Sequence, residues 1–312
     1  MTDLLGQVEA GGLIDPPRQV VAMLSGGRDS VCMLDLAVRA RGPAAVIALH
    51  VDYGLRPESH DDADFCASLC ERLGVELATE RPVRPEIGGN LQAWARDVRY
   101  AAAVRLAEAR DAVIITGHTA DDQVETILYR LASSPSRRAL LGMKARDGRL
   151  ARPLLGVTRE EVTAYDTERG LAWREDATNA EEGYARNKVR HGLVPELAAI
   201  HPAAVQNVLR TAALLRDEAE VLDGLVAAEL DGSGAAHRGR IAHARFAELP
   251  PPLRRLVLQR LADAAAGRPV AGAARFADQV AGLRRGGARL DLGDGVQAVL
   301  EAGVLRAELG DT

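Results

Sequence analysis

Hydrophobic and polar residues follow two different patterns along the first two hundred residues of the chain. Four short apolar runs, rich in β-branched residues, have the length and composition of buried strands: 19–24, 44–51, 75–80 and 111–116. Between and after them lie longer stretches whose apolar residues recur with helical spacing: 31–42, 59–74, 91–110 and 120–132. Strands that alternate with helices predict a parallel sheet with right-handed crossovers. We therefore expect an α/β domain, a parallel sheet flanked by helices, over residues 1–200.

One further helix is predicted from the chemistry of its ends. Thr158 and Glu161 have the spacing of a capping box, in which each side chain satisfies a backbone N–H of the other residue. Gly170 follows where a helix of ordinary length would end. We expect a helix between these residues.

After about residue 200 the pattern changes. Residues 202–230 and 251–267 have helical spacing, whereas 289–309 alternates and turns like a small β-hairpin. We expect a second, mostly helical C-terminal domain over residues 201–312 that ends in this hairpin.

Composition changes this picture little. Hydrophobic residues make up 47% of the chain and charged residues 27%, as in ordinary globular proteins. The net charge of -5 argues against a protein coated in basic charge for nucleic acid, so any such contact must be local. No apolar stretch reaches the roughly 18 residues of a membrane span, and the first residues lack the pattern of a signal peptide. We expect a cytoplasmic protein.

The three cysteines do not form a metal or redox motif. Cys32, Cys66 and Cys70 form neither a Cys-x-x-Cys pair nor a zinc-binding set. Cys66 and Cys70 share a helical stripe with two leucines, which favours packing in the core.

The chemistry-bearing stretch is Ser-Gly-Gly-Arg-Asp-Ser at 25–30, between the first strand and its helix. Backbone N–H groups and the helix dipole at such a turn favour an anion, and Gly26 and Gly27 allow close approach. Asp29 would repel a phosphate unless a cation intervened, which suggests Mg²⁺. The alternative is a Gly-Gly turn capped by Asp29 or Ser30 that needs no ligand. The loop lacks the lysine of a Walker A motif.

The loop resembles the Ser-Gly-Gly-x-Asp-Ser loop of ATP pyrophosphatases, which cleave ATP to AMP and pyrophosphate while adenylating a substrate. Five other segments resemble, in order and spacing, the tRNA(Ile)-lysidine synthetases: 50–59, 90–100, 115–126, 152–162 and 175–191. The resemblance covers about residues 20–195. Beyond them it rests on the helical region and on residues 289–305.

This resemblance implies a fold, an activity and partners. The fold would be adenine nucleotide alpha hydrolase-like, which is Rossmann-like. The enzyme would use ATP and Mg²⁺ to adenylate the C2 carbonyl oxygen of the wobble cytidine of tRNA(Ile) with a CAU anticodon. Free L-lysine would then displace AMP through its ε-amino group and form lysidine. The partners would be this tRNA and lysine, with no membrane, and a homodimer is left open.

The resemblance also implies roles for particular residues. The expected ATP-binding residues, with Asp29 as metal ligand, are Ser25, Gly26, Gly27, Arg28, Asp29, Ser30 and His50. The expected catalytic residues are Asp29, His118, Asp122 and Glu125. The residues expected to bind lysine or tRNA are Asn90, Arg96, Arg99, Asp121, Asp122, Glu125, Arg186, Asn187 and Arg190.

Each of these groups also has a structural explanation. Asp122 and Glu125 lie near a predicted helix N-terminus, where acids are stabilised by the dipole alone. Arg96 and Arg99 can belong to a solvated helical face, and the basic run from 186 to 191 can be ordinary surface. In the functional interpretation, Asp122 and Glu125 hold lysine or assist its deprotonation, and the arginines meet phosphate or carboxylate.

Two other classes of function are open. One is another ATP pyrophosphatase, such as a tRNA thiolating enzyme, NAD synthetase or GMP synthetase, and the other is a regulatory module that senses ATP without turnover. The acidic segment at 120–125 and the basic run argue for a second substrate and against a sensor. Residues 133–143 depart from the glycine-rich stretch that is usual in lysidine synthetases. Gln92 occupies a position where many members of that family carry an acidic residue.

Overall fold

The computed structural model describes residues 3–15, 18–54, 59–83, 91–134, 137–174, 184–231, 239–284 and 286–310. The chain forms two compact units, Met1–Ala212 and Ala213–Thr312. The division falls inside one continuous helix, α10 (Ala204–Asp231).

The first unit contains a six-stranded sheet in the order β3-β2-β1-β4-β6-β5. Its strands are β1 (Val20–Met23), β2 (Val46–Val51), β3 (Glu76–Glu80), β4 (Val113–Ile115), β5 (Arg146–Asp147) and β6 (Leu150–Ala151). All neighbours pair in parallel except β5 and β6, so the predicted parallel sheet is confirmed. The chain adds β2 and β3 on one side of β1, then returns to add β4 on the other. Such a reversal of strand order is where ligands bind in open α/β sheets.

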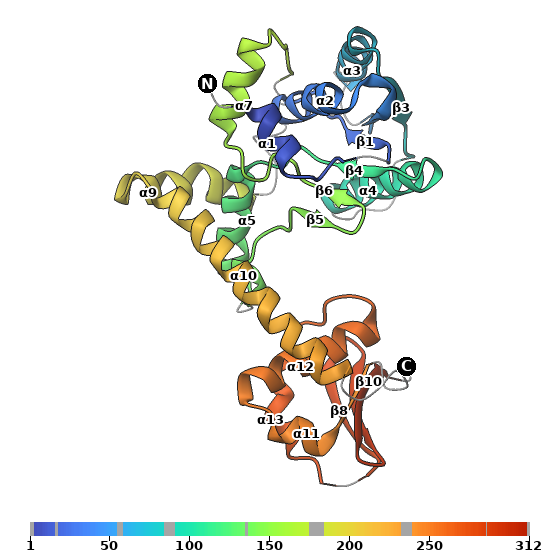
Figure 1. The fold of residues 1–312 in the computed structure, drawn as a ribbon, viewed down its shortest axis with the longest axis vertical. Helices are drawn as coiled ribbons and strands as arrows, with labels where there is room; N and C mark the ends of the chain where they lie inside the picture. Colours follow the sequence, from blue (N-terminus) through green and yellow to red (C-terminus); the bar gives the residue numbers. More distant parts are fainter. Residues whose placement is uncertain are drawn as a thin grey trace. The chain divides into compact units, whose positions relative to one another are not determined.

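Helices cover both faces of this sheet (Figure 1). They are α1 (Leu4–Ala10), α2 (Arg28–Arg41), α3 (Ser59–Leu73), α4 (Leu91–Ala109), α5 (Ala120–Ser133), α6 (Arg137–Leu140) and α7 (Arg159–Glu168). On one face, Val20 and Ala22 of β1 share a core with α1, α2, α3 and α7. On the other face, Val21 and Met23 pack with the alanines of α4. The alternation of side chains along one buried strand therefore supplies both cores.

The predicted capping box at α7 is confirmed. Thr158 accepts a hydrogen bond from the Glu161 N–H at 3.2 Å, and Glu161 accepts one from the Thr158 N–H at 2.8 Å. Gly170 follows the helix with a φ of +64°, a left-handed conformation that glycine adopts without strain. A second box, between Thr119 and Asp122, starts α5.

All three cysteines lie in the core, as predicted for Cys66 and Cys70. Cys32, Cys66 and Cys70 are buried free thiols that pack in the α2 and α3 core. Burial raises the pKa of Cys66 to about 12 and that of Cys70 to about 11. None of them is poised as a thiolate nucleophile.

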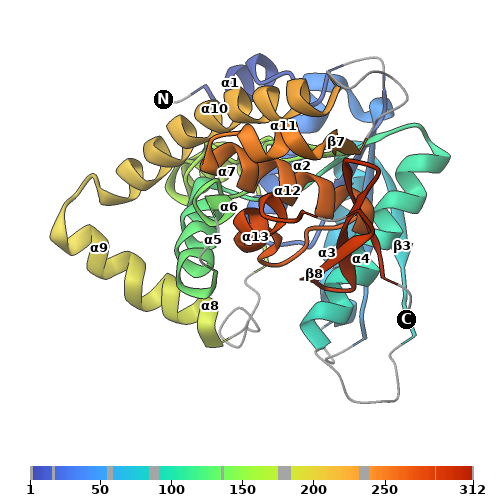
Figure 2. The ribbon, with the colours of Figure 1, turned by 90° about the horizontal axis from the view of Figure 1, so that it is seen from below.

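The first unit closes with α8 (Tyr184–Lys188), the π-helical turn η3 (Val189–Leu193) and α9 (Val194–Ile200). Figure 2 shows α8 beside α5, to which it also packs. This contact brings the basic run next to the acidic start of α5. A short 3-10 turn, η1 (Pro43–Ala45), precedes β2.

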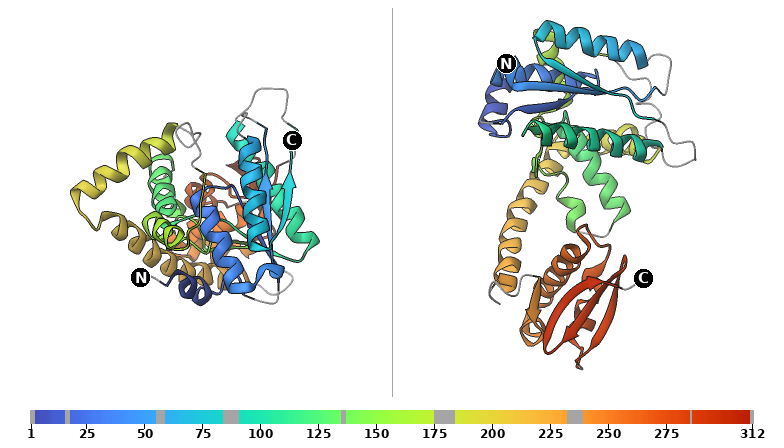
Figure 3. Two further views of the ribbon diagram at one scale, coloured as in Figure 1. Left: turned by 90° about the horizontal axis from the view of Figure 1, so that it is seen from above. Right: turned by 90° about the vertical axis from the view of Figure 1, so that its right-hand side faces the viewer.

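The second unit has its own core around an antiparallel sheet of order β7-β10-β9-β8 (Figure 3). Its elements after α10 are β7 (Arg240–Ala242), α11 (His243–Glu248), α12 (Pro251–Ala266), η5 (Ala273–Phe276), α13 (Ala277–Ala281), β8 (Ala288–Gly293), β9 (Val296–Glu301) and β10 (Val304–Leu309). The region predicted as a small hairpin thus holds three consecutive strands, which β7 extends to four. No helix in the described part of the chain is long and apolar enough to cross a membrane.

Candidate active site

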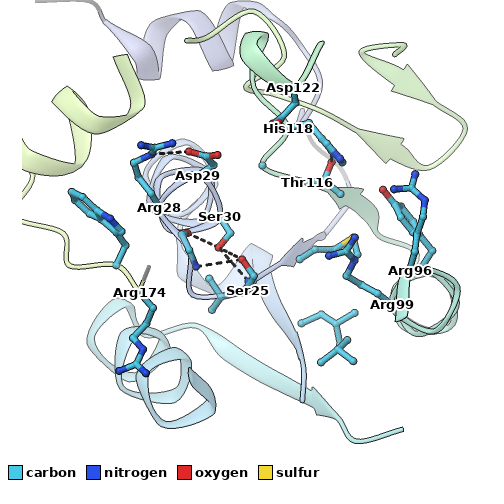
Figure 4. A pocket seen from close by; sticks show the side chains of 18 of the residues that line it. Ser25, Arg28, Asp29, Ser30, Arg96, Arg99, Thr116, His118, Asp122 and Arg174 are labelled. Carbon is cyan, nitrogen blue, oxygen red and sulfur yellow. Dashed lines mark hydrogen bonds and ion pairs between the residues drawn. The ribbon is translucent and has the colours of Figure 1, made fainter. Parts of the chain in front are cut away.

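A cavity of about 560 Å³ lies at the carboxyl ends of β1, β2 and β4 (Figure 4). Ser25 and the residues up to Ser30 follow β1, Tyr53 follows β2, and Thr116 to His118 follow β4. The rest of the polar lining comes from α4, α5, α7, α8, η3 and Arg174. The cavity therefore occupies the place where the strand order reverses, as the fold predicts for a ligand.

The loop after β1 is folded by its own serines. The Ser25 N–H donates to Ser30 Oγ at 3.2 Å, and Ser30 Oγ donates to the Gly27 carbonyl at 2.8 Å. Gly26 has a φ of +86°, and Gly27 is the N-cap of α2 without a side-chain cap. The start of α2 thus faces the cavity with backbone N–H groups, which is the geometry that binds anions.

Gly117 is needed for the loops after β1 and β4 to meet. A Cβ on Gly117 would lie 2.7 Å from the backbone oxygen of Asp29, closer than real Cβ contacts come. Only glycine permits this approach, which brings Thr116 and His118 beside the first turn of α2.

Asp29 lines the cavity with its carboxylate 24% exposed. Burial raises the pKa of this carboxyl, and the Arg28 guanidinium, whose Nε donates to Asp29 Oδ1 at 2.9 Å, opposes the rise. Mg²⁺ that binds with a nucleotide takes one or two carboxylates and completes its shell with phosphate and water. One carboxylate beside an anion-binding turn fits that donor set. Within the described residues, no cluster of three or more His, Cys, Asp or Glu exists that could hold a metal alone.

His118 is a neutral imidazole. Its Nδ1 lies 2.7 Å from Thr116 Oγ1. Burial lowers its pKa to about 4, with Arg152, Arg99 and Arg96 adding to the effect against the opposing charge of Asp122. At neutral pH His118 therefore carries no charge, and its ring can donate one hydrogen bond and accept another.

The acids at the start of α5 are paired with arginines. Arg159, the first residue of α7, donates to Asp122 at 2.6 Å and to Glu125 at 2.8 Å, and its backbone N–H donates to Asp121 at 2.8 Å. Arg190 forms a fork on Glu125, with distances of 2.7 and 3.2 Å. The pKa of Asp122 is lowered, because Arg159 and the Thr119 N–H outweigh the burial that would raise it.

These ion pairs give Asp122 and Glu125 different surroundings, although the sequence suggested the same role for both. Asp122 lines the cavity, and it also fulfils the capping role that was the structural alternative. Glu125 is 2% exposed, lies outside the cavity lining and is saturated by two arginines. Direct contact of Glu125 with a ligand stays a prediction, and its geometry favours positioning Arg159 and Arg190 instead.

Arginines of α4 and α8 also line the cavity. Arg96 and Arg99 stack on Tyr100, with guanidinium carbons 4.8 and 5.8 Å from the ring centre. Arg99 Nε is buried without a hydrogen-bond partner among the described residues. Arg186 donates to Thr126 at a long 3.4 Å. The two α4 arginines thus line the cavity and are not merely a solvated face.

Comparison with known proteins identifies the family of this fold and loop. The family described as PP-loop domain (ATP_bind_3) matches residues 4–197, well over half of the chain. The chain belongs to the PP-loop family. Membership implies the use of ATP.

Three curated relatives of this PP-loop protein are named tRNA(Ile)-lysidine synthase. A protein from Thermus thermophilus is 41% identical over 82% of this chain, and one from an Azoarcus species is 37% identical over 92%. The Pseudomonas aeruginosa protein is 40% identical over 66%. The chain spans 51%, 65% and 48% of the lengths of these relatives. The resemblance seen in the motifs is confirmed.

A solved structure supports the fold. The U34-tRNA thiolase NcsA from Methanococcus maripaludis superposes with a TM-score of 0.59 at 19% identity, over 69% of this chain and 78% of that one. Likeness at this identity concerns the fold alone.

The remaining predicted residues of the PP-loop protein lie in three kinds of place. Asn187 lines the cavity with Arg186 and Arg190. His50 is buried outside the cavity lining, and its Nδ1 lies 3.0 Å from the Leu24 carbonyl, so it supports the start of the loop. Asn90 lies outside the described residues.

Sequence reasoning missed several residues of the cavity wall. Arg159 lies in the segment 152–162, and its position directly after a capping Thr gives no sign of its three acidic partners. Trp173 and Arg174 also line the cavity. The Arg174 N–H donates to the Gly26 carbonyl at 2.9 Å, and its side chain pairs with Asp62 at 3.0 Å. No local pattern connects residues so far apart in sequence.

Proposed function

We propose that this chain is the catalytic and part of the tRNA-binding portion of a tRNA(Ile)-lysidine synthetase. It uses ATP to adenylate the C2 carbonyl oxygen of the wobble cytidine of tRNA(Ile) with a CAU anticodon and releases pyrophosphate, and the lysine amine then attacks C2 and displaces AMP with that oxygen. The observation that carries the proposal is a single cavity that joins the anion-binding loop to an arginine-paired acid, in a chain similar to proteins of that name. A cytoplasmic location and a homodimer stay predictions.

The loop end of the cavity suits the nucleotide. Backbone N–H groups at the start of α2, with Ser25 and Ser30, bind the phosphates, and Asp29 holds Mg²⁺. Bound Mg²⁺ would neutralise charge that develops on the departing pyrophosphate. His118, neutral at physiological pH, contributes hydrogen bonds to the reacting groups.

The other end suits lysine and the anticodon. Asp122 accepts the ammonium of lysine, held in orientation by Thr119 and Arg159. Arg96 and Arg99 meet the lysine carboxylate or a phosphate, and Arg186 meets the tRNA. The second unit adds further tRNA contacts.

Competing activities have less support. Thiolation through a cysteine persulfide would need an accessible thiolate, whereas every cysteine of the sequence is buried with a raised pKa. A sensor of ATP would have no use for an arginine-paired acid in the same cavity.

The test is incorporation of labelled lysine into tRNA(Ile) carrying the CAU anticodon, with ATP and Mg²⁺. Incorporation that depends on ATP, and that methionine tRNA does not support, is the expected result. Asp29→Asn should abolish it and leave thermal stability unchanged. Full lysidine formation by this variant would remove Asp29 from the mechanism, and no incorporation by the native chain would overturn the proposal.

A further inference from the structure

The residue before Asp29 makes an unusual contact with it. Neighbouring residues in a helix point in different directions, so side chains at i and i+1 seldom face each other. Here Arg28 nevertheless folds over the first turn of α2, and its Nε donates to Asp29 Oδ1 at 2.9 Å (Figure 4). Both side chains line the cavity, and they are 28% and 24% exposed.

The guanidinium is also held from a second helix. Arg28 Nη1 donates to Thr163 Oγ1 of α7 at 3.1 Å, and Thr163 in turn donates to the Arg159 carbonyl at 2.7 Å. Partial burial and this second anchor distinguish the pair from an exposed ion pair, which contributes little. The Arg28 side chain is therefore held by two helices, α2 through Asp29 and α7 through Thr163.

This contact places two cations in competition for one carboxylate. Mg²⁺ binds carboxylate oxygens directly at about 2.0–2.1 Å, and a guanidinium held on the same carboxylate would repel it. A phosphate in the loop would give the displaced guanidinium an alternative anion, because Arg28 also faces the cavity.

We propose that Arg28 is a displaceable counter-cation for Asp29: it occupies the carboxylate without nucleotide and moves to the phosphates when a nucleotide-bound divalent cation arrives. This inference rests on the proposed role of Asp29 as metal ligand. It makes Arg28 a positioning residue that couples metal binding to nucleotide binding. By linkage, the metal should tighten the nucleotide by the same factor as the nucleotide tightens the metal.

The decisive measurement is Mn²⁺ binding to the full chain, followed by the loss of free Mn²⁺ signal in electron paramagnetic resonance. Without nucleotide, Arg28→Met should bind Mn²⁺ about three- to thirtyfold more tightly than the native chain, since the competing hydrogen-bonded cation is gone. With ATP present the same variant should lose nucleotide affinity, so the coupling factor between ATP and Mn²⁺ should fall. Thr163→Val, which removes only the second anchor, should shift Mn²⁺ affinity in the same direction by less.

A matched pair outside the cavity controls for the loss of positive charge. Arg105 lies 3.1 Å from Glu80, and Arg105→Met should leave Mn²⁺ affinity unchanged. Equal or weaker Mn²⁺ binding by Arg28→Met, or an equal gain in Arg105→Met, would overturn the inference. Asp29→Asn distinguishes a failure of the proposed metal role of Asp29 from a failure of the inference about Arg28. If it binds Mn²⁺ as the native chain does, the metal role of Asp29 itself fails, whereas loss of binding in Asp29→Asn with no effect of Arg28→Met refutes the inference alone.

Discussion

Single side chains in this site act through the partners that hold them. Arg159 contacts three acids, and Glu125 in turn contacts two arginines. A buried charge that loses its partner is costly, so substitution at such a pair reports on the partner as well. Asp122 and Glu125 look equivalent in the sequence, but the structure gives them different expected phenotypes.

We expect Asp122→Asn to raise the lysine concentration needed for turnover about ten- to a hundredfold, and the ATP concentration much less. Glu125→Gln should instead lower the free energy of unfolding by about 1–3 kcal/mol, because Arg159 and Arg190 lose a buried partner. Steady-state lysidine formation, with lysine and ATP varied separately, and urea denaturation measure the two effects. Equal loss for both substrates in Asp122→Asn would move this acid to the nucleotide site.

A second residue-scale prediction concerns Asp166 of α7. Its side chain is fully buried, and neither carboxylate oxygen has an N–H or O–H partner among the described residues. Burial raises its pKa to about 7, the charge of Asp29 adds to this, and Arg28 opposes it.

A carboxyl whose pKa is higher in the folded state binds more protons there than in the unfolded chain. The contribution of Asp166 to the free energy of unfolding should therefore fall by about 1–3 kcal/mol as the pH rises from about 4 to about 7, and then level off. Urea denaturation of the native chain and of Asp166→Asn at several pH values tests this. The variant should lose most of this slope, and an unchanged slope would show that Asp166 does not titrate in this range.

At the scale of elements, segments with a clear apolar run or a capping motif were predictable, and the two-residue strands were not. The predicted strand at 19–24 corresponds to β1, and the capping box located α7 to the residue. β5 and β6 have two residues each and carry no periodic signal, so they went unpredicted. Their pairing depends on tertiary contacts.

The second turn of the C-terminal sheet was missed for a reason of turn chemistry. Asp294 and Gly295 join β8 to β9 with positive φ, as the sequence of a hairpin turn predicts. Ala302 and Gly303 join β9 to β10 in the same conformation, although alanine seldom adopts a φ of +49°.

That strained alanine yields a prediction. Ala302→Asn should raise the free energy of unfolding by about 0.5–1 kcal/mol, since Asn tolerates the left-handed region and Asn-Gly is the preferred turn pair. Ala302→Val, which adds a branched side chain at the same φ, is the opposing control and should destabilise. Urea denaturation measures both, and a gain from Val would contradict the strain.

At the scale of the whole molecule, motifs located the residues at the ends of the strands. They did not predict which of these residues pair with residues of other elements. The loop at 25–30, His118 and the α4 arginines were found because each lies in a segment that resembles the lysidine synthetases. Arg159 and Trp173 were not, because their partners lie on other elements. The sequence could therefore identify many of the residues that line the cavity, whereas the fold determines which of their charges form ion pairs.

The charge balance leads to a last prediction about tRNA. On a chain of net charge -5, tRNA contact must come from cations that are not already committed. Arg190 forms a fork on Glu125, whereas within the described part of the chain Arg186 makes one long hydrogen bond, to Thr126. Arg186 is therefore the more available of the two predicted phosphate contacts.

We expect Arg186→Ala to weaken tRNA binding and to reduce the log–log salt slope by up to about one unit. Arg190→Ala should change the slope less and lower stability, because Glu125 keeps only Arg159. Filter binding over a range of salt concentrations, with urea denaturation alongside, separates the two effects. A larger slope change in Arg190→Ala than in Arg186→Ala would show that the tRNA displaces Glu125 from Arg190, and that the acid cluster opens when the anticodon binds.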